Sequence, residues 1–316
     1  MDGMEDLFYE YLDDFVLADT PEKYAYAVLA FTSELKDSHV QVVLHVYDLF
    51  GKYQIPVDIA SYYDSYIVTG IWDGFEKRTE LLPGDILVSV NGESVDDLAR
   101  ERGRYVSVSS EERSAMSYAP VLLAVDSEEG NEIGIIRKGT AMTVTSQGTS
   151  SNGKSGGNLE ESGILEGNIG YIEAGSIKSA RELDRLMKDY EDTDGLIIDM
   201  RRYPGINMTG SFPSYFLKKK TGFCAFTTPD MQKPGCFLVN EGIYEPEEVP
   251  YRYDEKVVIL TDEFTVSHGE FVVMLLSEGK KVTVMGGTTN GTDGNITVLP
   301  IPGGKVAFTS IGIFWA

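Results

Sequence analysis

The chain has 316 residues, of which 42% are hydrophobic and 11% aromatic, enough apolar material for more than one folded core. Its 50 acidic residues outnumber 27 basic ones and give a formal net charge of −23 at pH 7. This charge argues against nucleic acid or an anionic membrane surface as a partner, because phosphate binding depends on clustered Lys and Arg.

The sequence also limits where the protein resides. No apolar run approaches the ~20 residues that span a bilayer, so we expect no integral membrane segment. The N-terminal MDGMEDLFYEYL lacks the basic-then-apolar pattern of a signal peptide. A cytoplasmic protein fits, as does the mature part of an exported protein whose leader is missing from this chain. Of the two, we favour an extracytoplasmic location.

The first 50 residues predict an N-terminal helical segment. Residues 4–36 carry apolar side chains at helical spacing in two runs, and Asp19-Thr20-Pro21 is a cap followed by proline at the first helical position. Residues 40–50 (VQVVLHVYDLF) then alternate loosely as a strand. We expect His45, inside that strand, to have a packing role.

Residues 51–145 predict a small β-rich domain. LLPGDILVSVNG (residues 81–92) contains a turn, an alternating strand and an Asn-Gly turn. The following residues, 146–165, are rich in Gly, Ser and Asn and predict a linker or exposed loop.

From residue 166 to residue 316, strands alternate with helices, which indicates a largely parallel sheet. VVILTDEFTVSHGEFVVMLL (residues 257–276) predicts a buried strand, a tight turn and a helix that starts near Ser267. Unpaired N–H groups and the dipole at a helix start favour negative charge. That setting suits a nucleophilic serine with an oxyanion, and it equally suits an ordinary serine cap.

A loop and two cysteines leave alternatives open. RRYPGIN (residues 201–207) follows a buried strand, and Gly205 either lets backbone N–H groups approach a ligand or forms an ordinary turn. Cys224 and Cys236 flank TTPDMQKPG, so they either face each other across a hairpin or remain two reduced thiols. Two cysteines and three histidines show no metal-site spacing.

A serine nucleophile needs a base to take its proton, and the chain has three histidines. His268 adjoins Ser267, and adjacent side chains diverge at a helix start, so we expect its backbone N–H rather than its ring to act. His39 lies in a polar loop beside Asp37 and Ser38. Taken alone, His39 fits a structural role as well as a catalytic one.

Four segments, in order, resemble the C-terminal processing, or tail-specific, serine peptidases. LKDSHV resembles the histidine-bearing helix end of the branch related to tricorn protease core domains, and LLPGDILVSVNGESV resembles part of the family's PDZ domain. DGLIIDMRRYPGIN resembles the strand and Pro-Gly-Gly loop, and VVILTDEFTVSHGE with VMGGTTNGT resembles the nucleophile turn and Gly-Thr-Gly loop. The four segments are residues 35–40, 81–95, 194–207, and 257–270 with 284–292.

The resemblance implies an α/β fold class (α+β overall), with a crotonase-like ββα catalytic core, a PDZ-like β domain and the N-terminal helical segment. It matches Ser267 to the nucleophile, His39 to the general base and Ser38 to the serine beside that base. The oxyanion hole would be formed by the backbone N–H groups of Gly205 and His268. The residues matched to the peptide-binding loop are Leu82, Pro83, Gly84 and Asp85.

The implied function is a serine endopeptidase that acts on a peptide or protein substrate by acyl transfer, with PDZ-like recognition of an extended peptide or C-terminus. No metal or organic cofactor is implied, and no oligomeric state is indicated. Thr292 stands where the other branch has a catalytic lysine, which argues against a Ser-Lys dyad.

Two departures keep alternatives open. Ile206 replaces the second glycine of the Pro-Gly-Gly loop. The carboxylate that orients histidine in this branch should follow IGIFWA, so we expect either a catalytic core that is incomplete at its C-terminal end or Asp37 in that role. A catalytically inactive peptide-binding scaffold is the first alternative, and an acyl-CoA enzyme of the crotonase type is the second.

Overall fold

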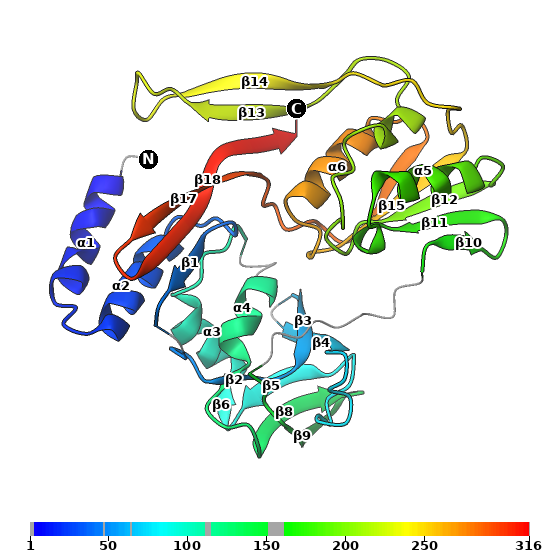
Figure 1. The fold of residues 1–316 in the computed structure, drawn as a ribbon. Helices are drawn as coiled ribbons and strands as arrows, with labels where there is room; N and C mark the ends of the chain where they lie inside the picture. The colour runs from blue at the N-terminus through cyan, green and yellow to red at the C-terminus, as the bar shows by residue number, and fades with distance from the viewer. Residues whose placement is uncertain (1–2, 47, 64, 111–114, 151–160, 316) are drawn as a thin grey trace. The chain divides into compact units, whose positions relative to one another are not determined.

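The computed structural model of the protein describes residues 3–46, 48–63, 65–110, 115–150 and 161–315 (Figure 1). The chain divides into two compact units. The first comprises Met1–Asn158 and Thr297–Phe308, and the second comprises Leu159–Ile296 and Thr309–Ala316. Helices and sheets occur in both, which confirms the mixed α/β class. The crotonase-like and PDZ-like descriptions and the expected domain boundaries stay predictions.

The first unit begins with the two predicted helices, α1 (Met4–Val16) and α2 (Pro21–Ser33). Thr20 caps α2 by accepting the N–H of Lys23, and Pro21 occupies the first helical position, as the sequence predicts. Strand β1 (Gln41–Leu44) follows and pairs antiparallel with the first residues of β18 (Gly304–Trp315). The strand is shorter than predicted, so His45 lies outside it, and its side chain is exposed rather than packed.

A six-stranded antiparallel sheet forms the rest of the first unit, in the order β3-β4-β5-β8-β9 with β6 paired to β5. Its apolar face covers a core that includes Ile59, Leu81 and Ile133. The elements of this part are β2 (Tyr53–Gln54), β3 (Val57–Tyr62), β4 (Ser65–Ile71), β5 (Ile86–Val90), β6 (Glu93–Ser94), α3 (Val95–Gly103), α4 (Ala115–Leu122), β7 (Ala124–Val125), β8 (Asn131–Arg137) and β9 (Thr140–Ser146).

The expected linker at residues 146–165 falls mostly on residues 151–160, which lie outside the described residues. Its flanks are ordered in sheets. Ser146 ends β9, and Gly163–Leu165 forms β10, which pairs antiparallel with β11. The C-terminal end of this stretch is therefore a strand rather than a linker.

The second unit is built on a sheet of order β10-β11-β12-β15-β16, in which the last four strands are parallel. Ile172, Ile198 and Ile259 are partners across three of these strands, and helices α5 and α6 pack on the face that carries them. Parallel strands end at one edge, so the loops that follow them gather there. The elements are β11 (Ile169–Glu173), α5 (Ala180–Asp189), β12 (Gly195–Asp199), β15 (Lys256–Thr261), α6 (His268–Ser277) and β16 (Val282–Gly286).

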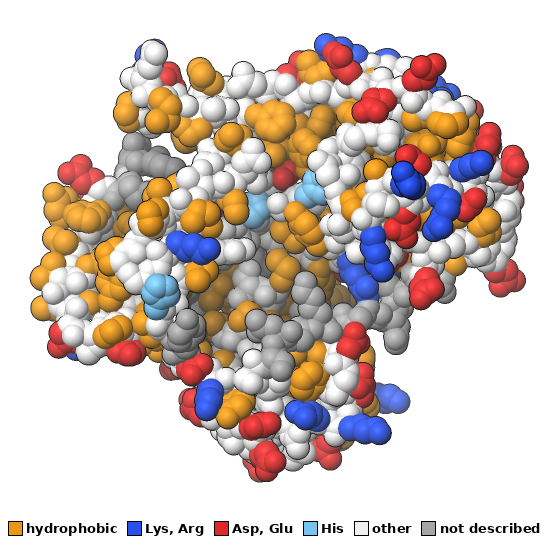
Figure 2. Space-filling view, viewed as in Figure 1, with side chains coloured by type: hydrophobic (Ala, Val, Ile, Leu, Met, Phe, Trp, Pro, Cys, Tyr) orange, Lys and Arg blue, Asp and Glu red, His pale blue; other side chains and the backbone are white. Residues whose placement is uncertain are grey.

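A long hairpin, β13 (Thr221–Pro229) and β14 (Phe237–Tyr244), completes the second unit and pairs through β13 with the end of β18. Hydrophobic side chains gather on its surface (Figure 2), and Val239 of β14 is 65% exposed. Cys224 pairs in register with Gly242, whereas Cys236 precedes β14, and both thiols are free. The two cysteines therefore do not face each other. Strand β17 (Gly294–Ile301) pairs with β18.

Among the described residues, no helix combines the length and the apolar character needed to cross a bilayer.

Candidate active site

Ser267 has an unusual backbone conformation, with φ 54° and ψ −121°. Residues with a Cβ rarely adopt positive φ, and a conventional helix cap has an extended backbone. Ser267 lies between the turn after β15 and the first residue of α6, and it is half-buried. Helix capping alone does not account for this geometry, so the surrounding contacts must hold the strained turn.

The buried carboxylate of Glu270 provides the main restraint. Its Oε2 accepts the backbone N–H of Ser267 at 3.1 Å and that of Thr292 at 2.8 Å, and its Oε1 accepts the N–H of Gly291 at 2.8 Å. The Ser267 N–H also donates to the Thr292 carbonyl at 2.7 Å. One charged group thereby joins the serine turn to the Gly291–Thr292 loop.

Buried polar contacts attach this turn to the ends of the parallel strands. The hydroxyl of the buried Thr265 donates to the carbonyl of Met200, directly after β12, at 2.9 Å. The Asn290 N–H donates to the Thr265 carbonyl at 3.1 Å, and the Thr292 hydroxyl donates to Asn290 Oδ1 at 2.6 Å. The turn is therefore fixed to both neighbouring loops.

The loop after β12 does not present the N–H of Gly205 as the sequence predicts. That N–H donates to the Ala174 carbonyl at 3.0 Å, and a Cβ on Gly205 would lie 2.2 Å from the Ile177 carbonyl oxygen. Glycine is required here because two backbone segments pack closely. Within the described residues, the N–H groups of Ile206 and His268 donate no hydrogen bond. We therefore replace Gly205 by Ile206 as the candidate donor from this loop.

A buried ion pair supports the start of the same loop. Asp199, at the end of β12, has no exposed surface and accepts hydrogen bonds from Arg201 at 2.5 Å and from the Tyr171 hydroxyl at 2.8 Å. Burial opposes ionisation of Asp199, but the hydrogen bonds from Arg201 and Tyr171 outweigh it and lower the pKa of the carboxyl group. This pair fixes the direction in which the chain leaves the sheet.

All of these contacts lie in the part of the chain that matches a known protein family. Residues 168–316 match the family model of peptidase family S41. We refer to residues 168–316, which are similar to peptidase family S41, as the S41 segment. The match confirms the resemblance to the C-terminal processing peptidases that the sequence motifs indicate.

Solved structures share the fold of nearly the whole chain. Mature CPAF has a TM-score of 0.72 at 13% sequence identity, over 97% of this chain and 82% of that chain. A putative peptidase from Parabacteroides merdae has a TM-score of 0.54 at 15% identity, over 98% and 76%. The photosystem II D1 C-terminal processing protease has a TM-score of 0.53 at 16% identity, over 97% and 82%. At sequence identities this low, the structural similarity shows a common fold and nothing more specific. No curated protein matches the sequence.

His39 lies in the first unit, outside the S41 segment, on a tightly bonded turn after α2. The Ser38 N–H donates to Ser109 Oγ at 3.0 Å, and the Ser109 N–H donates back to Ser38 Oγ at 2.9 Å. Asp37 Oδ1 accepts the backbone N–H of His39 at 2.9 Å. Ser38 thus holds the turn that carries His39, and this bond of Asp37 reaches the backbone of His39 rather than its ring.

The loop Leu82–Asp85, also in the first unit, has a structural arrangement. The Leu82 N–H donates to Asp85 Oδ2, the Gly84 N–H to the Val68 carbonyl and the Asp85 N–H to the Leu82 carbonyl. The buried Asp85 carboxylate pairs with Arg137 at 2.7 Å, and hydrogen bonds from Arg137 lower its pKa. Because these N–H groups are committed and the loop buries a negative charge, its geometry does not support the predicted capture of a peptide carboxylate.

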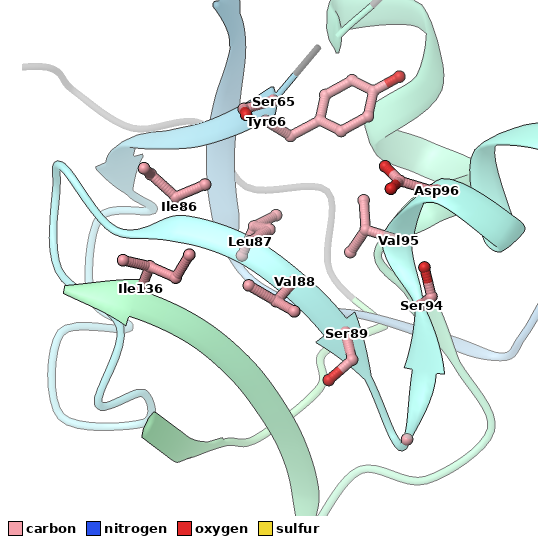
Figure 3. A pocket seen from close by; sticks show the side chains of 11 residues that line it. Ser65, Tyr66, Ile86, Leu87, Val88, Ser89, Ser94, Val95, Asp96 and Ile136 are labelled. Atoms are coloured by element: carbon pink, nitrogen blue, oxygen red, sulfur yellow. The ribbon is translucent and has the colours of Figure 1, made fainter. Parts of the chain in front are cut away.

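A cavity of about 320 Å³ lies next to this loop (Figure 3). It opens where β4 and β5 separate, because these strands pair only at Ile67 and Ile86, and the pairing of β5 with β8 is interrupted by a bulge at Val88. The start of α3 closes the other side. The cavity is lined by Ser65, Tyr66, Ile86–Ser89, Gly92, Ser94–Asp96 and Ile136. The sequence motifs pointed to the loop and not to this neighbouring groove. The signal for the groove in the sequence is ILVSVNGES (residues 86–94), a strand followed by the serine that precedes α3.

Asp293 is a second group that sequence reasoning missed. Its Oδ2 is buried and makes no hydrogen bond within the described residues. Burial, reinforced by the nearby charge of Glu270, raises the pKa of Asp293 to about 7. The sequence feature that could have indicated Asp293 is its position between Thr292 and Gly294, in the loop after β16. The described residues contain no group of three or more His, Cys, Asp or Glu side chains that could hold a metal ion.

We expect Glu270→Gln to destabilise the S41 segment by about 2–3 kcal/mol, because an amide NH₂ would replace one of two oxygens that together accept three backbone N–H groups. Urea denaturation measures the change in the free energy of unfolding. Glu278→Gln, at an exposed position that ends the same helix, is the matched control and should change it by less than about 0.5 kcal/mol. An equal loss of unfolding free energy in the two variants would show that Glu270 does not restrain the serine turn.

The raised pKa of Asp293 predicts a stability that falls as pH rises. The folded state binds this proton more tightly than the unfolded chain does, so the stabilising contribution is complete below the unfolded pKa and is lost as pH rises to about 7. Between pH 4 and pH 8 the wild type should lose roughly 2–4 kcal/mol more than Asp293→Asn. Urea titrations across this range measure it, with Asp254→Asn at an exposed site as control. Parallel curves for wild type and Asp293→Asn would show that this carboxyl group does not titrate there.

Proposed function

We propose that the protein is a serine endopeptidase that cleaves peptide bonds by acyl transfer at Ser267. The match of residues 168–316 to the model of a peptidase family supports the reaction class. The observation that carries the residue assignment is the backbone of Ser267, with φ 54° and ψ −121° at a strand-to-helix turn. Such a strained turn is how α/β hydrolases expose a serine hydroxyl above a sheet.

In the proposed reaction, Ser267 Oγ attacks the peptide carbonyl while His39 takes its proton, and the carbonyl oxygen becomes an oxyanion. The N–H groups of His268 and Ile206, which have no partner among the described residues, would stabilise that charge together with the N-terminal dipole of α6. The protonated base then donates to the leaving amine, and water hydrolyses the acyl-enzyme by the reverse sequence of proton transfers. Ser38 serves this scheme by holding the His39 turn.

Peptide recognition is assigned to the groove between β4, β5 and α3 in the first unit. Where β4 and β5 diverge, main-chain groups beside Tyr66 and Val88 border a cavity instead of another strand. An extended peptide can add to such an edge through backbone hydrogen bonds, which is the PDZ-like mode. Val88, with 45% of its surface exposed, is one of the apolar side chains in the cavity lining that a bound peptide could contact.

A serine-reactive fluorophosphonate probe tests the nucleophile. We expect the full chain to be labelled and Ser267→Ala to be unlabelled, and His39→Ala should label at least about 10³-fold more slowly because the serine loses its base. The exposed His45 supplies the matched control, His45→Ala, which should label like the wild type. A folded wild type without label would overturn the peptidase and favour the inactive peptide-binding scaffold.

The groove assignment predicts that Val88→Glu lowers the kcat/KM for casein cleavage about tenfold, because a charge is placed where an extended chain would lie. The fluorophosphonate labelling rate should not change, since this small probe does not need the groove. Met142→Glu, at a similarly exposed position on β9, controls for surface charge. The assignment is wrong if both variants cleave casein equally well.

A further inference from the structure

The side chain of His268 makes a contact that its role as a backbone donor does not use. Its Nε2 lies 3.2 Å from the backbone nitrogen of Met208 and accepts that N–H. The ring is half-buried and lies beside Tyr203, with 6.5 Å between the ring centroids. Since a nitrogen that accepts a hydrogen bond carries no proton, His268 is neutral in this arrangement, with its proton on Nδ1.

This contact anchors one end of the loop that contains Ile206. At the other end, the Gly205 N–H is bonded to the Ala174 carbonyl. The Ile206 N–H lies between these two anchors and has no partner within the described part of the chain. His268 thus contacts the loop through its ring, while its own backbone N–H is at the start of α6.

We propose that the neutral His268 side chain is a positioning residue, which holds the Ile206 N–H in a fixed relation to the His268 N–H so that the two donors form one oxyanion site. The inference rests on the proposed function of Ser267. In this scheme the ring of His268 positions the loop that contains Ile206, and the backbone N–H of His268 stabilises the oxyanion.

Protonation would remove this anchor. An imidazolium Nε2 carries a proton, so it would face the Met208 N–H donor-to-donor and release the loop. Tyr203 on the loop is the titratable side chain whose ring lies beside that of His268, and Glu270 lies two residues further along α6. The Glu270 carboxylate is already bonded to backbone N–H groups, and burial is what lowers the pKa of His268. The anchor is therefore present at neutral pH and is lost as pH falls.

Two substitutions of His268 separate positioning from simple packing. His268→Leu fills similar space but cannot accept a hydrogen bond, whereas the amide oxygen of His268→Gln reaches the position of Nε2 and does not titrate. We expect His268→Leu to lower the fluorophosphonate labelling rate at pH 7 by about tenfold to a hundredfold, somewhat less than the loss of an oxyanion donor. His268→Gln should recover most of that rate.

The pH profile of labelling gives the second readout. In the wild type, the logarithm of the labelling rate should fall at acid pH with a slope above one, because protonation of His39 removes the base and protonation of His268 adds a loss of about tenfold to a hundredfold. In His268→Gln the slope should be one. Thermal unfolding checks that each variant is folded. If His268→Leu does not fold, the acid slope of the labelling profile of His268→Gln still tests the proposal.

The inference is overturned if His268→Leu labels at the wild-type rate, or if His268→Gln keeps the wild-type slope. Either result can occur in a protein whose Ser267 is labelled. Failure of the proposed function gives a different result, because the wild type would then be unlabelled at every pH.

Discussion

The geometry of the candidate site depends on one buried carboxylate. Glu270 accepts backbone N–H groups from Ser267, Gly291 and Thr292, and has no cationic partner among the described ion pairs. Its charge is balanced instead by peptide dipoles and by the N-terminus of α6. Without these bonds, a positive φ at Ser267 would relax to a conventional cap. The carboxylate therefore maintains the strain that distinguishes Ser267 from an ordinary cap residue.

Two glycine-containing loops and one helix start converge here because the sheet is parallel. The ends of β12, β15 and β16 lie at one edge, and Thr265 links the first of them to the serine turn through the Met200 carbonyl. Gly205 contributes through its small size, since its backbone packs against the segment that follows β11. The same edge supplies the Asp199–Arg201 pair. The parallel sheet thus determines where the loops of the candidate site lie, and the residues of those loops supply its functional groups.

Sequence reasoning succeeded where the determining interactions are local. Residues 257–276 predicted strand, turn and helix because apolar periodicity and a capping serine are visible within twenty positions. It failed for Gly205, whose N–H is taken by Ala174, and for Asp85, whose ion-pair partner Arg137 is 52 residues away. The burial of Asp293 was equally invisible, since it results from tertiary packing around a polar loop. Motifs therefore located the loops but not the atoms that remain available in them.

The charges around Ser267 show why the titration of Asp293 matters to the proposed chemistry. An oxyanion formed there would add negative charge to a region that already contains Glu270. Two nearby carboxylates resist joint ionisation, and this repulsion, added to burial, brings the pKa of Asp293 to about 7. Near neutral pH, Asp293 is thus partly protonated, which reduces its negative charge near the proposed oxyanion site, while backbone N–H groups bind the Glu270 carboxylate. The site tolerates acidic neighbours because one is bonded to backbone dipoles and the other can hold a proton.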